Sequence, residues 1–286
     1  MNSTPVTGQY STGRSRRGIE QALLGVVGGG EQALAAAGLD PGSLRPADLG
    51  ALEDFHTMGR IATAQLAQLA GVSRKDVVLD AGSGIGGTAR FLAAQHGCRV
   101  TAIDVTPEYC ETARWLNQLT GLDKLIDVRI GDVTALPLGD ASFSVVTSQH
   151  VQMNIADKPG LYAEARRVLA PGGRLAIWDI AAGDDSAVGS AGGLDYPLPW
   201  ADRPELSHLV APGELRALIE QAGFTVDHWA DLTPEAAPFM RAFIARPADP
   251  LGLHNFVADF AVKAANLTAA LSAGRVRAIQ AIARPA

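Results

Sequence analysis

From Val77 onward, short apolar runs alternate with segments of about ten to fifteen residues whose apolar positions recur at helical spacing. The apolar runs, in order, are VVLD, RVTAID, IDVRI, FSVVTS, GRLAIWDI, TVDHWADL and GRVRAIQAIARPA. Strands separated by helices of this length join as parallel neighbours, and a parallel sheet must be covered on both faces. The alternation therefore predicts an α/β fold with a doubly wound, mostly parallel seven-stranded sheet.

Two helical regions lie outside this alternation. Residues 1–70 are expected to form an N-terminal helical lid segment, broken by the turn GLDPGSLRP, and 71–286 to form the main domain. A second helical region, at about 234–273, separates the last two apolar runs. We expect both regions to close over a ligand at one edge of the sheet.

The stretch VVLDAGSGIGG matches the pattern G-x-G-x-x-G at Gly82, Gly84 and Gly87. Such a turn is usually taken to bind a dinucleotide, because glycines let the backbone approach a ligand closely. However, Asp80 lies two residues before the first glycine, and a carboxylate would repel a pyrophosphate. The acid favours a ligand with a positive centre, and a nicotinamide-dependent oxidoreductase is kept as an alternative.

Polar residues follow the next strands as well. In a doubly wound sheet the ligand lies beyond the carboxyl ends of the strands, so these residues can meet there. Asp104 ends the second run and can accept both hydroxyls of a ribose, Asp132 follows the third, and the fourth ends in TSQHVQMN. Each acid could instead cap a helix.

Four segments at these intervals, VVLDAGSGIGGTARFLA, VTAIDVTPEYCETA, GDVTALPLGDASFSVVTSQ and EARRVLAPGGRLAIWD, resemble the class I S-adenosylmethionine-dependent methyltransferases. The likeness is greatest to the small-molecule branch that includes the ubiquinone, sterol and sarcosine/dimethylglycine enzymes. It implies a Rossmann-like methyltransferase fold, S-adenosylmethionine as cofactor and S-adenosylhomocysteine as product.

The resemblance also implies roles for individual residues. Gly82, Ser83 and Gly84 would contact the methionine part of the cofactor, with Asp80 orienting the turn or the cofactor's amino group. The remaining cofactor contacts would be Asp104 to the ribose, Val105 to adenine, Asp132 with Val133 to the adenine amine and face, and Gln149 to the amino-acid part.

Methyl transfer from a sulfonium is an in-line displacement that needs alignment and exclusion of water, but no metal. A general base would help an acidic hydroxyl or a protonated amine to react, and His150 is the leading candidate, with His56 second. Packing or capping roles are the alternatives for both histidines. Tyr196, Trp200 and His254 are candidates for the acceptor site, against surface-loop or core roles.

Composition narrows the function further. The 30 acidic and 24 basic side chains give a formal net charge of −6, which argues against nucleic acid as a partner. Cys98 and Cys110 are too few for a disulfide framework or a zinc site and suggest a reducing cytoplasm. The sequence contains no run that could span a membrane, and its N-terminus does not match an export signal.

The leading hypothesis is methyl transfer to a small organic acceptor at carbon, nitrogen or oxygen. One alternative enzyme would use the bound cofactor as a scaffold for a cyclisation or another non-methylating reaction, since fold does not determine function. A non-enzymatic cofactor-binding module is a further alternative. A homo-oligomer is left open.

Overall fold

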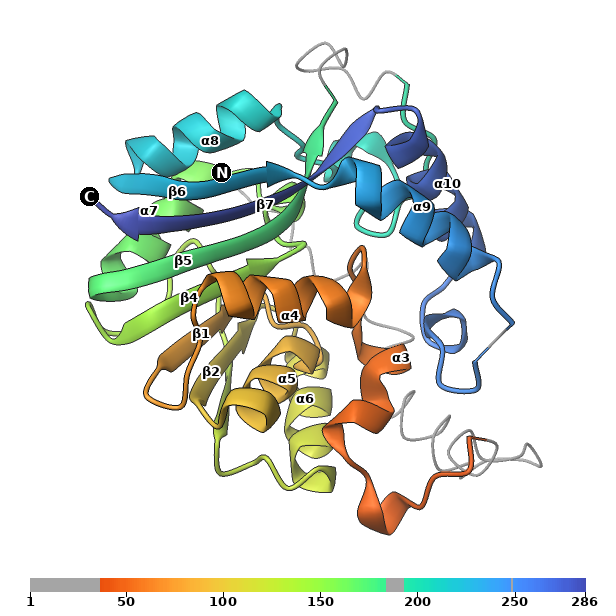
Figure 1. Ribbon diagram of the computed structural model, residues 1–286, viewed down its shortest axis with the longest axis horizontal. Helices are drawn as coiled ribbons and strands as arrows, with labels where there is room; N and C mark the ends of the chain where they lie inside the picture. The colour runs from red at the N-terminus through yellow and green to blue at the C-terminus, as the bar shows by residue number, and fades with distance from the viewer. Residues whose placement is uncertain (1–36, 184–192, 248) are drawn as a thin grey trace.

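The computed structural model describes residues 37–183, 193–247 and 249–286, so the first part of the expected N-terminal lid segment lies outside the described residues. One seven-stranded sheet forms its centre, in the order β3-β2-β1-β4-β5-β7-β6 (Figure 1). The strands are β1 (Val77–Ala81), β2 (Arg99–Asp104), β3 (Ile126–Ile130), β4 (Phe143–Gln149), β5 (Leu169–Ala182), β6 (Phe224–Asp231) and β7 (Val276–Pro285).

The sheet is parallel except for β7, which pairs antiparallel with both β5 and β6. The chain enters β7 beside the carboxyl ends of its neighbours, because Val276 pairs with Ala182 and Ile279 with Asp231. A strand that starts at that edge must run in the opposite direction. The predicted fold class, a doubly wound and mostly parallel seven-stranded sheet, is confirmed.

Helices cover both faces of the sheet (Figure 1). The α-helices are α3 (Gly50–Glu53), α4 (Gly59–Leu69), α5 (Gly87–His96), α6 (Pro107–Leu119), α7 (Lys158–Val168), α8 (Pro212–Gln221), α9 (Thr233–Ile244) and α10 (Phe260–Ser272). Short 3-10 helices are η2 (Pro41–Ser43), η3 (Pro46–Leu49), η4 (Gln152–Asn154), η5 (Pro204–Leu206) and η6 (Leu253–Asn255).

Alternate residues of the central strands pack on opposite sides, as the pleat requires. Val78 and Val145 belong to the core that contains α4, α5, α9 and α10. Their neighbours Leu79 and Val146 belong to the core beneath α7 and α8. Burial on both faces explains why the strands are nearly continuous apolar runs in the sequence.

Some helix boundaries differ from the helical segments KPGLYAEARRVLA, PGELRALIEQAGF and HNFVADFAVKAANLTAALSA that the sequence predicts. The helix expected to reach Ala170 ends at Val168, because Ala170 precedes Pro171 and such residues favour extended backbone. The second cap helix, expected from His254, begins at Phe260, after Asp259 with its left-handed φ of 54°.

The described helices include none that is both long and apolar enough to cross a membrane. Among the described residues, no group of three or more His, Cys, Asp or Glu side chains could hold a metal ion. Cys98 and Cys110 are buried thiols without a disulfide, and burial raises the pKa of each to about 11. Both cysteines therefore pack as small apolar side chains, as predicted.

Candidate active site

The glycine turn between β1 and α5 has one side closed by protein and one side open. Its start is held by the amides of Gly82 and Ser83, which both donate to the Ile103 carbonyl at 2.9 Å. A Cβ on Gly82 would lie 2.5 Å from Val151 Cγ2, whereas a Cβ on Gly84 would meet nothing within 4 Å. Gly82 is thus required for packing, and the space beside Gly84 is where a ligand can approach.

Asp104 links this turn to the end of β2. Its Oδ2 accepts the Gly84 amide at 2.8 Å, and its Oδ1 accepts the Thr106 amide at 2.9 Å. Each carboxylate oxygen has a second lone pair that can accept a further hydrogen bond. Val105, directly after it, is 42% exposed.

Asp80 lies beneath the turn and is only 2% exposed. Its pKa is raised to about 7, mainly by burial and also by the nearby Asp104, although the Ala89 amide and Arg90 act to lower it. Asp80 Oδ2 and Ser83 Oγ are both buried without a hydrogen-bond partner. The end of β1 and the glycine turn therefore contain two polar atoms that a polar ligand or water would satisfy.

Asp132 and Val133 are arranged differently from the expectation. Asp132 is exposed, and its Oδ1 accepts the amide and hydroxyl of Thr134, both at 2.8 Å, in an Asx turn. Val133 is 7% exposed and packs in the core beneath α7. Asp132 stays a candidate contact to adenine, whereas the burial of Val133 does not favour the contact expected of it.

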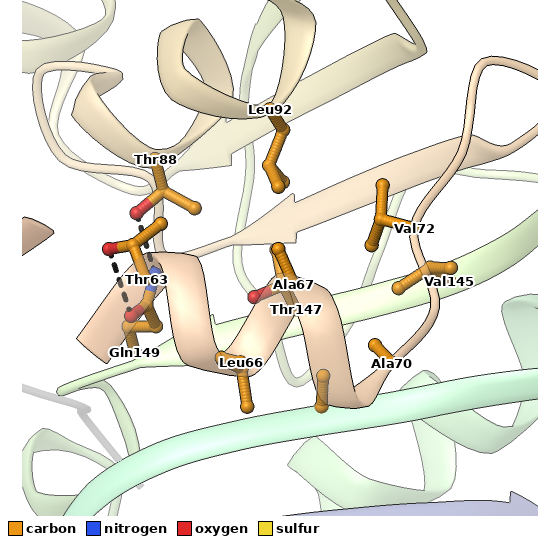
Figure 2. A pocket seen from close by; sticks show the side chains of 11 residues that line it. Thr63, Leu66, Ala67, Ala70, Val72, Thr88, Leu92, Val145, Thr147 and Gln149 are labelled. Atoms are coloured by element: carbon orange, nitrogen blue, oxygen red, sulfur yellow. Dashed lines mark hydrogen bonds between the residues drawn. The ribbon is translucent and has the colours of Figure 1, made fainter. Parts of the chain in front are cut away.

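Gln149 connects two helices at the end of β4. Its Oε1 accepts the Thr63 hydroxyl of α4 at 3.3 Å, and its Nε2 donates to Thr88 of α5 at 2.8 Å. Figure 2 shows this chain of hydrogen bonds at one end of a cavity between α4, α5 and the sheet. The cavity is otherwise lined mainly by aliphatic side chains, so it is a packing space and not a site for a polar ligand.

The two candidate histidines do meet beyond the end of β4. Their ring centroids are 5.9 Å apart, and His150 adopts a left-handed φ of 56°. Thr57 donates its amide to His150 Nε2 at 3.3 Å and places its hydroxyl 3.0 Å from the same nitrogen. Burial and the neighbouring His56 lower the pKa of His150 well below its usual value. His150 is therefore a neutral imidazole whose Nε2 lone pair points to Thr57.

Asp179 holds the turn that follows His150. Its Oδ2 accepts the amides of Val151 and Gln152, both at 2.9 Å, and the side chain is fully buried at the end of β5. Burial raises the pKa of Asp179 to about 6, whereas these amide hydrogen bonds lower it. The sequence analysis did not identify Asp179 as a site residue, although an acidic residue near the end of a predicted apolar strand could have indicated it.

The three acceptor-site candidates differ in their exposure. Tyr196 is half-buried and packs on the core, and His254 is exposed in η6. Trp200 is 2% exposed and donates its indole N–H to Ser207 Oγ at 2.9 Å. The burial of Trp200 favours core packing over the expected acceptor-wall role, because an enclosed ring cannot contact an acceptor without moving.

A buried ion pair missed by the sequence analysis joins the N-terminal segment to the glycine turn. Arg90 Nε donates to Glu53 Oε1 at 2.6 Å, and both side chains are 0% exposed. Arg90 also donates to Asn117 Oδ1 at 2.7 Å and to the Ile85 carbonyl within the turn. This pair fastens α3 onto the first turn of α5, where a Cβ on Gly87 would lie 2.7 Å from Glu53 Cβ.

Part of the chain matches a known domain family: residues 79–177 fit the family model described as a methyltransferase domain. The glycine/sarcosine/dimethylglycine N-methyltransferase of Actinopolyspora halophila is 31% identical over 181 residues, which cover 63% of this chain and 31% of the relative. This chain spans between 31% and 54% of the length of the first curated relatives that it matches.

Solved structures share the fold. The geranyl diphosphate C-methyltransferase of Streptomyces coelicolor A3(2), in complex with Mg2+, geranyl diphosphate and S-adenosyl-L-homocysteine, has a TM-score of 0.66 at 14% identity, covering 80% of this chain and 79% of that chain. The 4+2 cyclase SpnF has a TM-score of 0.61 at 21% identity, covering 96% of this chain and 97% of that chain. At these identities the likeness establishes the fold alone.

Proposed function

We propose that this protein binds S-adenosylmethionine and transfers its methyl group to a small organic acceptor, because residues 79–177 match the family model described as a methyltransferase domain. The observation that carries the proposal is the open side of Gly84. There a positive-φ backbone, the Asp104 carboxylate and the exposed Val105 side chain lie together at the carboxyl edge of the sheet. This edge is where doubly wound folds bind ligands.

The residues present fit such a cofactor. Gly84 leaves room for a ligand against the backbone, Asp104 can accept the ribose hydroxyls, and Val105 offers an apolar surface to a base. The unsatisfied Ser83 hydroxyl and Asp80 carboxyl suit a polar amino-acid group. When bound, the sulfonium supplies the activated methyl group.

The protein's own part in the reaction is to orient the acceptor, exclude water and receive a proton. In Figure 1, α3, α9 and α10 lie beyond the carboxyl ends of the parallel strands, and there they would keep the site dry, which favours a displacement that destroys charge. His150 is neutral and can hold a proton once its Nε2 turns from Thr57 to the acceptor. His56, 5.9 Å away, is the second candidate.

Parallel calorimetric titrations with S-adenosylmethionine, S-adenosylhomocysteine and reduced nicotinamide dinucleotide test the cofactor. Asp104→Ala should weaken S-adenosylhomocysteine binding by about 2–4 kcal/mol, because two hydrogen bonds to a charged group are lost. The matched control is Asp127→Ala, which removes an exposed carboxylate paired with Arg129 and should change nothing. Binding of the nicotinamide alone, or unchanged affinity in Asp104→Ala, contradicts the assignment.

The alternative reaction keeps the cofactor as a scaffold, as in a cyclisation. A cofactor labelled in its methyl group separates the two reactions, since only methyl transfer moves label into the acceptor. The fold likeness to a cyclase does not decide between them, because one fold can support several reactions.

We further infer a cytoplasmic protein that does not bind nucleic acid. The buried thiols of Cys98 and Cys110 and the net charge of −6 support these inferences. Retention on a DNA or RNA column at 0.1 M salt would contradict the second. Light scattering of the full chain would establish whether it forms a homo-oligomer.

A further inference from the structure

Three phenylalanine rings from separate segments form a continuous aromatic surface, which we call the ring wall (Phe55, Phe243 and Phe260). Phe55 precedes α4, Phe243 lies near the end of α9, and Phe260 begins α10. The Phe55 and Phe260 centroids are 6.4 Å apart, and those of Phe243 and Phe260 are 6.2 Å apart. The N-terminal segment and the cap therefore meet through aromatic contacts.

The backbone joins the ring wall to the candidate reaction centre at Phe55. Phe55 is followed directly by His56, whose ring is 5.9 Å from that of His150 at the end of β4. All three phenylalanines are half-buried, so each ring keeps some surface open although another ring packs on it. A molecule whose reactive atom lies near the histidines can extend along these rings.

The geometry of the ring wall suits an apolar body better than a cation. Phe260 packs on its neighbours at interplanar angles of 43° and 83°, within the usual range for direct ring contact. Rings in mutual contact leave no space among them to enclose an ammonium group, as an aromatic cage would need. They offer instead an extended surface for hydrophobic contact.

Among the described residues of 37–70 and 233–272, the Lys and Arg side chains that are not exposed are already paired. Lys263 is the one basic side chain that is not exposed among the described residues of 233–272, and its Nζ is 2.8 Å from Asp202 Oδ1. On the other side, Arg60 pairs with Asp54 at 3.1 Å and with Glu53 at 3.3 Å. A carboxylate buried here would have to break one of these pairs, which is costly.

We propose that the acceptor is a neutral, predominantly apolar molecule that lies along Phe55, Phe260 and Phe243, and not a zwitterionic amino acid. This inference rests on the proposed function, because it takes the histidine end of the ring wall to be the place of methyl transfer. It assigns the cap a role in selecting the acceptor. It also separates this protein from the relative whose name includes glycine and sarcosine.

The test uses the full chain saturated with S-adenosylhomocysteine, with 1-naphthol as the neutral probe and dimethylglycine as the zwitterionic probe. Calorimetry should show that 1-naphthol binds at least tenfold more tightly than dimethylglycine. Phe260→Ala should weaken 1-naphthol about tenfold, the factor that corresponds to losing one aromatic contact and its buried area. The control Val262→Ala, at a half-exposed position on the same helix, should stay within twofold.

If Phe260→Ala does not fold, Phe55→Leu replaces it and should weaken 1-naphthol at least threefold. Equal or tighter binding of dimethylglycine, or unchanged 1-naphthol binding in the folded variant, overturns the proposal. Saturation with S-adenosylhomocysteine is measured first. Failure at that step refutes the proposed function, whereas normal cofactor binding with the wrong probe preference refutes the acceptor class alone.

Discussion

Removing the charge of Arg90 tests whether the N-terminal segment and the glycine turn are held by one buried ion pair. In Arg90→Met, Glu53 stays fully buried without its 2.6 Å partner, and the Ile85 carbonyl loses its guanidinium donor. Breaking a buried pair in this way costs about 3–5 kcal/mol. That is a large part of the roughly 5–15 kcal/mol by which a folded protein is stable.

The double variant Glu53→Leu with Arg90→Met separates folding from binding. An apolar replacement of both partners removes the stranded charge, so we expect it to recover most of the free energy of unfolding. The Ile85 carbonyl remains without its donor in the double variant. We therefore expect S-adenosylhomocysteine to bind at least tenfold more weakly than to the wild type, because a factor of ten corresponds to the free energy of about one hydrogen bond to a charged group. Stability and affinity should therefore respond differently.

Urea unfolding and calorimetry measure the two effects. Arg216→Met is the control, because Arg216 and Glu220 form an exposed pair at 3.0 Å whose loss should cost less than about 1 kcal/mol. A cost below about 1 kcal/mol in Arg90→Met would refute the energetic reasoning. Wild-type affinity in the double variant would show that the pair holds the fold and not the turn.

Three further predictions follow from single residues. Gly82→Val should unfold the protein, because its side chain would overlap Val151, whereas Gly84→Val should melt cooperatively but not bind S-adenosylhomocysteine. Thermal melting and calorimetry check this, and a folded Gly82→Val or a Gly84→Val that binds the ligand would contradict it. His150→Gln should lower turnover by about a hundredfold with little change in cofactor affinity, measured with any accepted substrate, and a loss below threefold would move the role to His56 or to no residue. Asp80→Asn should make the free energy of unfolding less dependent on pH. The raised pKa of about 7 means that Asp80 stabilises the fold when protonated, an effect that is complete below about pH 4 and lost as the pH rises through 7. Urea unfolding should therefore show the variant becoming more stable relative to the wild type, by up to roughly 4 kcal/mol above pH 7, and parallel pH profiles of the two proteins would refute this.

The order of strands and helices was determined by the sequence alone. Apolar runs such as VVLD and the helical spacing of apolar residues in 107–119 are local patterns that can be identified in the sequence. Strands of a parallel sheet are buried on both faces, so they form nearly continuous apolar runs. The glycine turn and Asp104 were likewise predictable, because they follow strands whose carboxyl ends must meet at one edge. Local chemistry thus located the candidate site.

The tertiary structure decided which of these residues face a ligand and which serve the fold. Gly82 and Gly84 look alike in the sequence, but Val151 closes the space beside one and leaves the other open. Glu53 and Arg90 lie 37 positions apart, and Trp200 gave no sign of its burial. No spacing rule connects such residues, because their contacts arise only when distant segments pack together and each side chain must satisfy its charge or exclude water there.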